Sequence, residues 1–312
     1  MRSDFWAGAV LSLSALALFG AVFPLHIPSE SPVGALARML DNLMPVFLTL
    51  ACLGGVATVM LGRRIMGCVL VVAAFLGGVG QLSEHRDISL PLKDSATPGL
   101  RVLFFNARGD NAAQAHRIAD AVLAANADVV VIAEPDAIYS ALNKLDDEYV
   151  FVSPCARDAC QLLVASRQSP ARFWRVNLND VWPGRYAVAE LTVAGRPVFV
   201  VANHLVKPWF SGISESEYAR LRAQYNWLSL PSVVVGDFNS APWSRPMRNL
   251  LQKTGMKTLR LPVGSWPSWA GRFALPVDQV LVHNGARVLS VEVFGRGLGS
   301  NHLGFVADIG FP

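Results

Sequence analysis

The segment Val-Val-Val-Gly-Asp-Phe-Asn-Ser, residues 233–240, joins an apolar run to a carboxylate and a carboxamide. A run of β-branched residues of this length predicts a buried strand. Because Asp237 and Asn239 are two residues apart, their side chains are expected on the same side of the strand's exit. Such a pair suits a hard cation, a phosphoryl oxygen and an attacking water. On its own the segment is better explained as a strand-ending turn, so its interpretation depends on polar residues at other strand ends.

The first 82 residues are far more apolar than the remainder of the chain. The 312 residues are 52% hydrophobic and only 16% charged, which is too apolar for a purely soluble enzyme. Residues 5–23, 43–62 and 65–82 contain no Asp, Glu, Lys, Arg or His. At about 1.5 Å per helical residue, each stretch is long enough to cross a hydrocarbon layer of roughly 30 Å. The sequence therefore predicts a multi-pass anchor of three transmembrane helices within residues 1–82.

The basic residues that flank these stretches predict the orientation of the anchor. Arg2 and the Arg63-Arg64 pair are expected at one side of the membrane, with Arg38, Arg86 and Lys93 at the other. The positive-inside rule places the first group in the cytoplasm, so the C-terminal domain is predicted to be exported.

Cysteine usage points in the same direction. Cys155 and Cys160 lie close together in one segment, which is typical of a disulfide formed in an oxidising compartment. The alternative is a pair of free thiols. Two cysteines with no nearby histidine are too few for a tetrahedral zinc site.

The chain beyond the anchor is predicted to be a linker, residues 83–98, followed by one domain over residues 99–312. The linker is polar and contains Pro91 and Pro98. Strands are expected at 100–106, 128–134, 149–153, 161–166, 186–193, 197–203, 232–237, 277–283, 286–294 and 305–309. Helices are expected at 111–125, 137–145, 215–228 and from about residue 243. Strands outnumber helices, which favours an α/β (α+β) domain with two packed sheets covered by helices.

Polar residues recur where these strands begin or end. They are Asn106, Glu134, His204, Asp237, Asn239, Asp278, Asn301 and His302. Taken singly, each has an ordinary structural explanation, such as a turn residue, a solvated strand end or a hydrogen-bonded core histidine. Their order along the chain is more informative than any one of them.

This order resembles the endonuclease/exonuclease/phosphatase superfamily, the DNase-I-like hydrolases, over about residues 100–309. The motifs that carry the resemblance are Phe-Asn106, Asp128-Val-Val-Val-Ile-Ala-Glu134, Asn203-His204-Leu, Gly236-Asp-Phe-Asn239, Val277-Asp278-Gln-Val and Ser300-Asn301-His302. The N-terminal spans, together with His204-Leu-Val-Lys207-Pro and Asn239-Ser-Ala-Pro-Trp243, resemble its bacterial membrane-anchored branch. The resemblance implies a four-layer sandwich of two mixed sheets between helices. Together with the orientation predicted from the basic residues, it predicts an anchor in the bacterial inner membrane and a periplasmic catalytic domain.

The resemblance also implies roles for individual residues. Glu134 would bind a divalent metal, Mg²⁺ or Mn²⁺, with Asn106 beside it and position 301 at a further metal position. Asp237 would orient or deprotonate the attacking water, and Asn239 would hold a phosphoryl oxygen. His204 would donate to the phosphate or the leaving group, while Asp278 would fix His302 against the phosphate. A cation, an imidazolium and carboxamides together meet the charge demand of phosphodiester hydrolysis.

One departure from the family pattern leaves two functions open. The family usually has Ser-Asp-His where this chain has Ser300-Asn301-His302, so one metal position is expected to be weaker. The leading interpretation is a membrane-anchored, metal-dependent phosphoesterase that hydrolyses a phosphodiester. The alternative is a catalytically weakened module that binds phosphate or lipid through a degenerate site.

The substrate class is open between nucleic acid and phospholipid. The net charge of +4 includes no basic run, so no long track for duplex nucleic acid is evident. Aromatic residues near the motifs would stack a base, contact a lipid or simply pack loops; they are Trp209, Phe210, Trp243, Trp266, Trp269 and Phe273. The expected partners are the lipid bilayer and the phosphodiester substrate, and no protein partner is evident.

Overall fold

The computed structural model describes residues 2–93, 99–154 and 160–312. The chain divides into two compact units. Unit 1 contains Met1–Asp87, Pro208–Glu215 and Trp243–Arg248, and unit 2 contains Ile88–Lys207, Ser216–Pro242 and Asn249–Pro312.

Unit 1 is built on four helices. They are α1 (Arg2–His26), α2 (Gly34–Asn42), α3 (Met44–Met60) and α4 (Arg64–Ile88). The helices α1, over Asp4–His26, and α4 are long and apolar enough to cross a membrane. The helices α2 and α3 pass that test only as a pair, which is bent by 69°. The anchor thus has two or three candidate spans, where the sequence predicted three.

Small residues set the packing of these helices. A Cβ atom on Gly54 would lie 1.9 Å from Ser14 Oγ, so α1 and α3 are in close contact there. A Cβ on Gly67 would lie 2.6 Å from the carbonyl oxygen of Gly55, which brings α4 equally close to α3. Backbones that approach to this extent need residues without bulky side chains. Gly54, Gly55 and Gly67 therefore allow the close packing of α3 against α1 and α4.

Part of the predicted linker is regular structure. Residues 83–88 continue α4, and Ser89–Leu90 forms the short strand β1. The polar residues of 83–87 are compatible with a helix, and the helix stops just before Pro91, which disfavours helical backbone in the residue preceding it. Residues 94–98 lie outside the described part of the chain.

Unit 2 contains two mixed sheets and a two-stranded ribbon. The six-stranded sheet has the order β12-β13-β2-β3-β5-β4 and the five-stranded sheet has the order β11-β9-β8-β7-β6. In the first, the strands are β2 (Leu100–Asn106), β3 (Val129–Ala133), β4 (Phe151–Val152), β5 (Leu162–Ser166), β12 (Arg287–Phe294) and β13 (Gly304–Gly310). In the second, they are β6 (Arg172–Val176), β7 (Tyr186–Val193), β8 (Arg196–His204), β9 (Ser232–Asp237) and β11 (Asp278–His283). In the ribbon, β1 pairs with β10 (Thr258–Leu259).

Alternation along the strands shows that both faces of the six-stranded sheet are covered. In β2, Val102 and Phe104 belong to the core between the sheets. The intervening Leu103 and Phe105 belong to a second core, which also includes Ile118. Successive side chains of a strand point to opposite faces, so a strand buried on both faces is apolar throughout.

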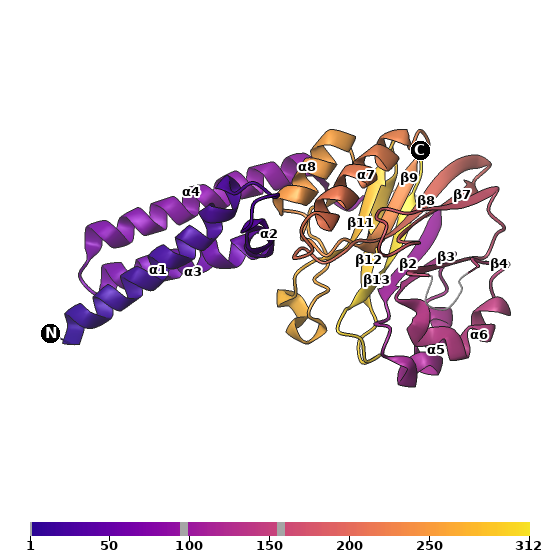
Figure 1. Cartoon of the computed structure of the whole chain (residues 1–312), viewed down its shortest axis with the longest axis horizontal. Helices are drawn as coiled ribbons and strands as arrows, with labels where there is room; N and C mark the ends of the chain where they lie inside the picture. Colours follow the sequence, from indigo (N-terminus) through magenta and orange to yellow (C-terminus); the bar gives the residue numbers. More distant parts are fainter. Residues whose placement is uncertain (1, 94–98, 155–159) are drawn as a thin grey trace. The chain divides into compact units, whose positions relative to one another are not determined.

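Helices and 3-10 turns lie outside the two sheets. The six-stranded sheet is flanked by α5 (Ala115–Ala124), η2 (Pro135–Ala141) and α6 (Asn143–Asp146), and α7 (Ile213–Trp227) lies beside β8 and β9 (Figure 1). The remaining elements are η1 (Ala112–Gln114), α8 (Arg245–Thr254) and η3 (Ser268–Phe273). The ring of Tyr225 of α7 lies against that of Tyr186 of β7 at a tilt of 42°, and its hydroxyl accepts a hydrogen bond from the side chain of Asn203. The predicted arrangement of two mixed sheets flanked by helices is confirmed.

Gly236 allows β8 and β9 to approach closely beside Asp237. A Cβ atom there would lie 2.4 Å from the carbonyl oxygen of Asn203. We expect Gly236→Ala to destabilise the folded state by about 1–3 kcal/mol, because overpacking forces the strands apart. The midpoint of thermal unfolding of the full chain in detergent should fall by several degrees. Gly80→Ala is the control, since nothing lies within 4 Å of its Cβ position; equal midpoints for the two variants would contradict the argument.

Candidate active site

Three neighbouring strands bring the first group of predicted site residues together. His204 ends β8 and is opposite Asp237, which ends the parallel strand β9. Asp278 begins β11 and is opposite Asp237 from the other side, because β11 runs antiparallel to β9. All three side chains are buried. The strand ends predicted from sequence thus meet at one edge of the five-stranded sheet.

The six-stranded sheet supplies Asn106 and Glu134. Asn106 ends β2 opposite Ala133, and Glu134 follows β3 with a left-handed backbone (φ 53°). The Glu134 side chain accepts a hydrogen bond from the Gly109 N–H at 2.8 Å through Oε2. The Asn106 amide oxygen accepts one from the Arg108 N–H at 3.0 Å. These backbone bonds fix both side chains at the edge of the sheet.

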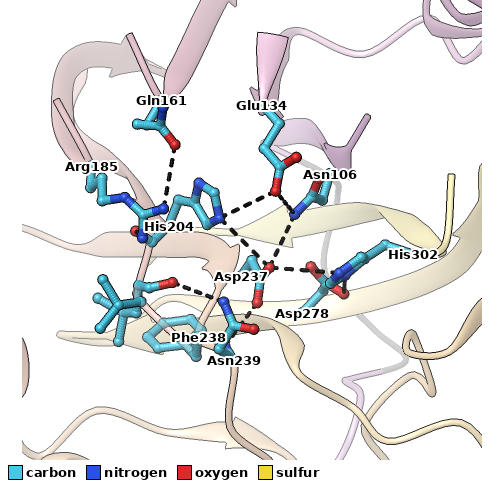
Figure 2. A network of polar contacts seen from close by, with 12 residues as sticks. Asn106, Glu134, Gln161, Arg185, His204, Asp237, Phe238, Asn239, Asp278 and His302 are labelled. Atoms are coloured by element: carbon cyan, nitrogen blue, oxygen red, sulfur yellow. Dashed lines mark hydrogen bonds and ion pairs between the residues drawn. The ribbon is translucent and has the colours of Figure 1, made fainter. Parts of the chain in front are cut away.

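Asn106 joins the two sheets at the site. Its Nδ2 atom donates to Asp237 Oδ2 at 3.1 Å and lies 3.4 Å from Glu134 Oε1 (Figure 2). His204 Nε2 lies 3.8 Å from Glu134 Oε1 and 3.9 Å from Asp237 Oδ2. Figure 2 shows these side chains converging from different strands toward one point. The predicted group is therefore a single site.

His302 enters the site from the loop before β13. Its Nδ1 atom is 2.8 Å from Asp278 Oδ2, and its Nε2 atom is 3.9 Å from Asp237 Oδ2. The loop is held by Ser300, whose hydroxyl donates to the carbonyl oxygen of Asn106 at 2.7 Å and accepts the His302 N–H at 3.0 Å. The pairing of Asp278 with His302 that the sequence predicted is present.

Asn239 lies beside Asp237 in the turn after β9. Its backbone is left-handed (φ 49°), and its N–H donates to Asp237 Oδ1 at 2.8 Å. Its amide Nδ2 donates to the carbonyl oxygen of Leu205 at 2.8 Å. One amide hydrogen is used by that bond, so the other is the one left for a phosphoryl oxygen.

The combined effect of burial and neighbouring charges raises the pKa values of both Asp237 and His302. Burial and the neighbouring Asp278 carboxylate raise the pKa of Asp237 to about 7. Burial alone would lower the pKa of His302, but the carboxylates of Asp278 and Asp237 raise it to about 9. His302 is therefore an imidazolium at neutral pH, while Asp237 titrates near neutrality.

His204 has the opposite environment. Burial, with the nearby Arg185 guanidinium and His302, holds the pKa of His204 well below its usual range. Arg185 is itself buried, donates to the carbonyl oxygen of His204 at 3.0 Å through Nη1, and lies 3.3 Å from Gln161 Oε1 through Nη2. His204 is therefore neutral at pH 7, and any bond it donates to a phosphate comes from a neutral ring.

The site residues fit a divalent cation. Atoms of Asp237, Asp278 and His302 lie within 4.8 Å of one another. Asp278 Oδ2 and His302 Nδ1 are hydrogen-bonded to each other, however, so Glu134 and Asp237 are the better carboxylate ligands, and Asn106 lies beside both of them. Carboxylate and amide oxygens are the ligands that Mg²⁺ and Mn²⁺ prefer. Three carboxylates beside one imidazolium also leave an excess of negative charge for a cation to offset.

Asn301 and the predicted disulfide are not placed among these side chains. Asn301 is exposed, and its carbonyl oxygen accepts the Ser268 N–H at 2.8 Å. Within the described residues, no hydrogen bond joins its side chain to Glu134 or Asn106, and its role at a metal position stays a prediction. The disulfide predicted between Cys155 and Cys160 is not tested, because Cys155 lies outside the described residues.

Other residues support the site without having been predicted to do so. Arg185 belongs to none of the motifs quoted above, and the structure places it behind His204. Gln161 follows the cysteine segment, and no sequence motif indicated that it would lie at the site. Ser300 belongs to a recognised motif, but its bond to Asn106 depends on a contact 194 residues away in sequence.

The Asp278–His302 pair makes a prediction about protonation. We expect Asp278→Asn to lower the pKa of His302 from about 9, because the substitution removes the first carboxylate that raises it. A nitrogen-15 NMR titration of the histidine rings in the full chain, with chelator present, measures this. Glu148→Gln, a change at an exposed surface pair with Arg167, is the control and should leave the value unchanged. An unaltered His302 titration in Asp278→Asn would contradict the assignment.

Comparison with known structures agrees with the geometry, although a comparison with curated protein sequences found no match. A protein from Beutenbergia cavernae described as an endonuclease/exonuclease/phosphatase is 20% identical, with a TM-score of 0.57, covering 69% of this chain and 72% of that one. TDP2 from D. rerio, in complex with a single-stranded DNA product, is 15% identical with a TM-score of 0.56, covering 68% and 98%. At such identities the likeness shows the fold alone. The model of the Endonuclease/Exonuclease/phosphatase family matches residues 103–302, and the chain belongs to that family.

Proposed function

We propose that this protein is a membrane-anchored phosphoesterase that hydrolyses a phosphodiester with the aid of a divalent cation. The observation that carries the proposal is the position of Asp237. Its buried carboxylate is within hydrogen-bond distance of Asn106 and 3.9 Å from the imidazoles of His204 and His302. Family membership supports hydrolase chemistry at this position.

The carboxylates have separate tasks in this proposal. Glu134 and Asn106 would hold the cation, Mg²⁺ or Mn²⁺, which when bound would polarise a phosphoryl oxygen and offset developing charge. Asp237 accepts a proton from the attacking water. A base whose pKa is near the working pH is well matched to that step.

The nitrogen donors stabilise the phosphoryl group. His302, held as an imidazolium by Asp278, donates from Nε2 to a phosphoryl oxygen. Asn239 offers its remaining amide hydrogen, and neutral His204 offers a ring N–H to the phosphate or the leaving group. Fixed donors aimed at developing negative charge lower the barrier without reorganising during the reaction.

The polar contacts of α2 favour three membrane spans over two. Arg38 of α2 is buried in unit 1, where it donates to the carbonyl oxygen of Pro208 and pairs with Glu215. Residues 208–215 follow shortly after β8 in the chain and cannot lie in the hydrocarbon layer, so α2 lies outside it too. The 17 residues of α3 would then form the third span by themselves. Their length of about 25 Å is at the lower limit of roughly 17 residues for a transmembrane helix.

An odd number of spans places the N-terminus and the hydrolase domain on opposite sides of the membrane. The ion pair between Asp4 and Arg63 puts the start of α1 and the α3–α4 turn at the same end of the helices. The basic residues at that end favour the cytoplasm, so the catalytic domain is proposed to be periplasmic and the membrane the bacterial inner membrane.

We expect alkaline phosphatase fused after Pro312 to be active in a bacterial host, because the domain is exported. The same enzyme fused after Gly62, at the α3–α4 turn, should be inactive and serves as the control. Fluorescence from a green fluorescent protein fused after Pro312 would instead place the domain in the cytoplasm and overturn the orientation.

Hydrolysis itself is tested with the full-length protein in detergent, on a panel of soluble phosphodiesters and phosphomonoesters with Mg²⁺ or Mn²⁺. We expect turnover that chelator abolishes and added Mg²⁺ restores. Asp237→Asn should lower the rate by about 10²- to 10⁴-fold, because the proton acceptor is lost. Glu134→Gln should raise the Mg²⁺ concentration needed for half-maximal rate.

Glu148→Gln is the matched control and should behave as the natural protein in this assay. No turnover of any substrate by the natural chain would count against the enzyme. Asn301, which replaces the usual aspartate of the family, supports the alternative of a phosphate-binding module. Turnover that appears only in Asn301→Asp would favour that alternative.

A further inference from the structure

The segment from Arg260 to Phe273, here called the apolar loop, exposes large hydrophobic side chains next to the site. Leu261, Trp269 and Phe273 are 85%, 86% and 79% exposed, and Trp266 is 39% exposed. Among the described residues of unit 2, the other exposed large hydrophobic side chains are scattered along the chain. They are Leu92, Val150, Val181, Trp227 and Val293. A concentration of this kind in one loop marks an interaction surface.

The apolar loop is a folded projection with a fixed base. Trp266 and Leu275 exchange backbone hydrogen bonds of 3.0 and 2.6 Å, which close the loop. A Cβ atom on Gly264 would lie 2.7 Å from the carbonyl oxygen of Ala274, so the two arms of the loop touch. The exposed side chains are therefore presented on an ordered backbone.

The base of the loop is bonded to the catalytic residues. Ser265 Oγ accepts the N–H of Asp278 at 3.0 Å. The N–H of Ser268 donates to the carbonyl oxygen of Asn301 at 2.8 Å, and its hydroxyl bonds the carbonyl oxygen of Ser300 at 3.0 Å. The loop is thus tied to Asp278 and to the two residues that precede His302, so whatever it contacts lies beside the site.

The same loop begins where the chain leaves the anchor. Strand β1 pairs with β10, and the Arg260 N–H donates to the carbonyl oxygen of Leu90 at 2.8 Å. Ser89 comes seven positions after Leu82, the last residue of the apolar part of α4, and seven positions are about 10 Å of helix. The headgroup region on each side of a bilayer is about 5–8 Å thick, so the start of the loop is held within reach of it.

The composition of the loop suits a lipid surface. Trp and Phe favour the membrane interface, and an exposed Leu has no stacking function on a nucleic acid base. Arg260 and Arg272 are exposed, and residues 257–273 contain no Asp or Glu, so anionic headgroups are not repelled. Two exposed arginines do not form the long basic track that a nucleic acid backbone requires.

We propose that the apolar loop inserts into the bilayer interface and that the substrate is a membrane phospholipid presented there. The proposal rests on the phosphodiesterase function proposed above. In the reaction, water adds to phosphorus, one P–O ester bond of the lipid breaks and Asp237 takes the proton of the water. The departing alkoxide takes a proton from the solvent, to which Asp237 returns its own. The loop itself takes no part in the chemistry, and its effect is on access of the lipid to the site.

The test compares two substrates of the same full-length protein in lipid nanodiscs of phosphatidylcholine and phosphatidylglycerol. The double variant Trp269→Ser, Phe273→Ser should hydrolyse the phospholipid at least about tenfold more slowly, because two interfacial anchors are lost. Its turnover of soluble bis(4-nitrophenyl) phosphate should stay within about twofold. Val150→Ser, which changes an equally exposed apolar residue elsewhere, should affect neither substrate.

Phospholipid hydrolysis that is unaffected by the double variant would overturn the proposal. So would a natural protein that turns over the soluble diester but no phospholipid. A loss of activity in the double variant that is confined to a single-stranded oligonucleotide substrate would overturn it as well. The last would assign the loop to base stacking. Failure of the natural protein on every substrate would instead refute the proposed function. Insertion is measured independently by quenching of tryptophan fluorescence with brominated lipids, which should be weaker in Trp269→Phe; unchanged quenching would refute insertion.

Discussion

The hydrogen bond from Asn106 to Asp237 is the contact on which the architecture of the site depends. Asn106 belongs to the six-stranded sheet and Asp237 to the five-stranded sheet, and an apolar core fills the space between the two sheets. A buried carboxylate without a partner is costly, so this bond requires the sheet edges to align. Ser300 strengthens the alignment because it bonds the backbone of Asn106 while holding His302. The contacts that hold the site residues in place therefore also fix the alignment of the two sheets.

Most of the site was predictable from the sequence because its signals are local. A β-branched run followed by a polar residue marks the end of a buried strand, as in the segments that end at Glu134 and at Asp237. That these strand ends converge was inferred from the family resemblance, because the pattern of a single strand contains no information about its neighbours. The predicted strands at 100–106 and 232–237 coincide with β2 and β9. The left-handed backbones of Glu134 and Asn239 were not predicted, since the surrounding structure imposes them.

What the sequence did not reveal depends on distant contacts. Strand β6 reads Arg-Phe-Trp-Arg-Val, which lacks the alternation of a half-buried strand, and it lies at the edge of its sheet. The extension of α4 through residues 83–88 was hidden by their polarity, which was interpreted as a linker. Residues 208–215 and 243–248 belong to unit 1 through contacts such as that between Arg38 and Glu215, 177 residues apart. No local pattern carries information of this range.

The two imidazoles show how neighbours, and not residue type, assign chemical roles. His302 is next to two carboxylates and stays charged, whereas His204 has a buried guanidinium close by and stays neutral. If the two environments were exchanged, His204 would be a second cation beside Arg185. No imidazolium would then face the proposed position of the phosphoryl group. The carbonyl of His204 accepts a bond from Arg185, so the residue that suppresses its charge also orients its backbone. Positive charge is thus directed to one side of Asp237 by the same contacts that build the fold.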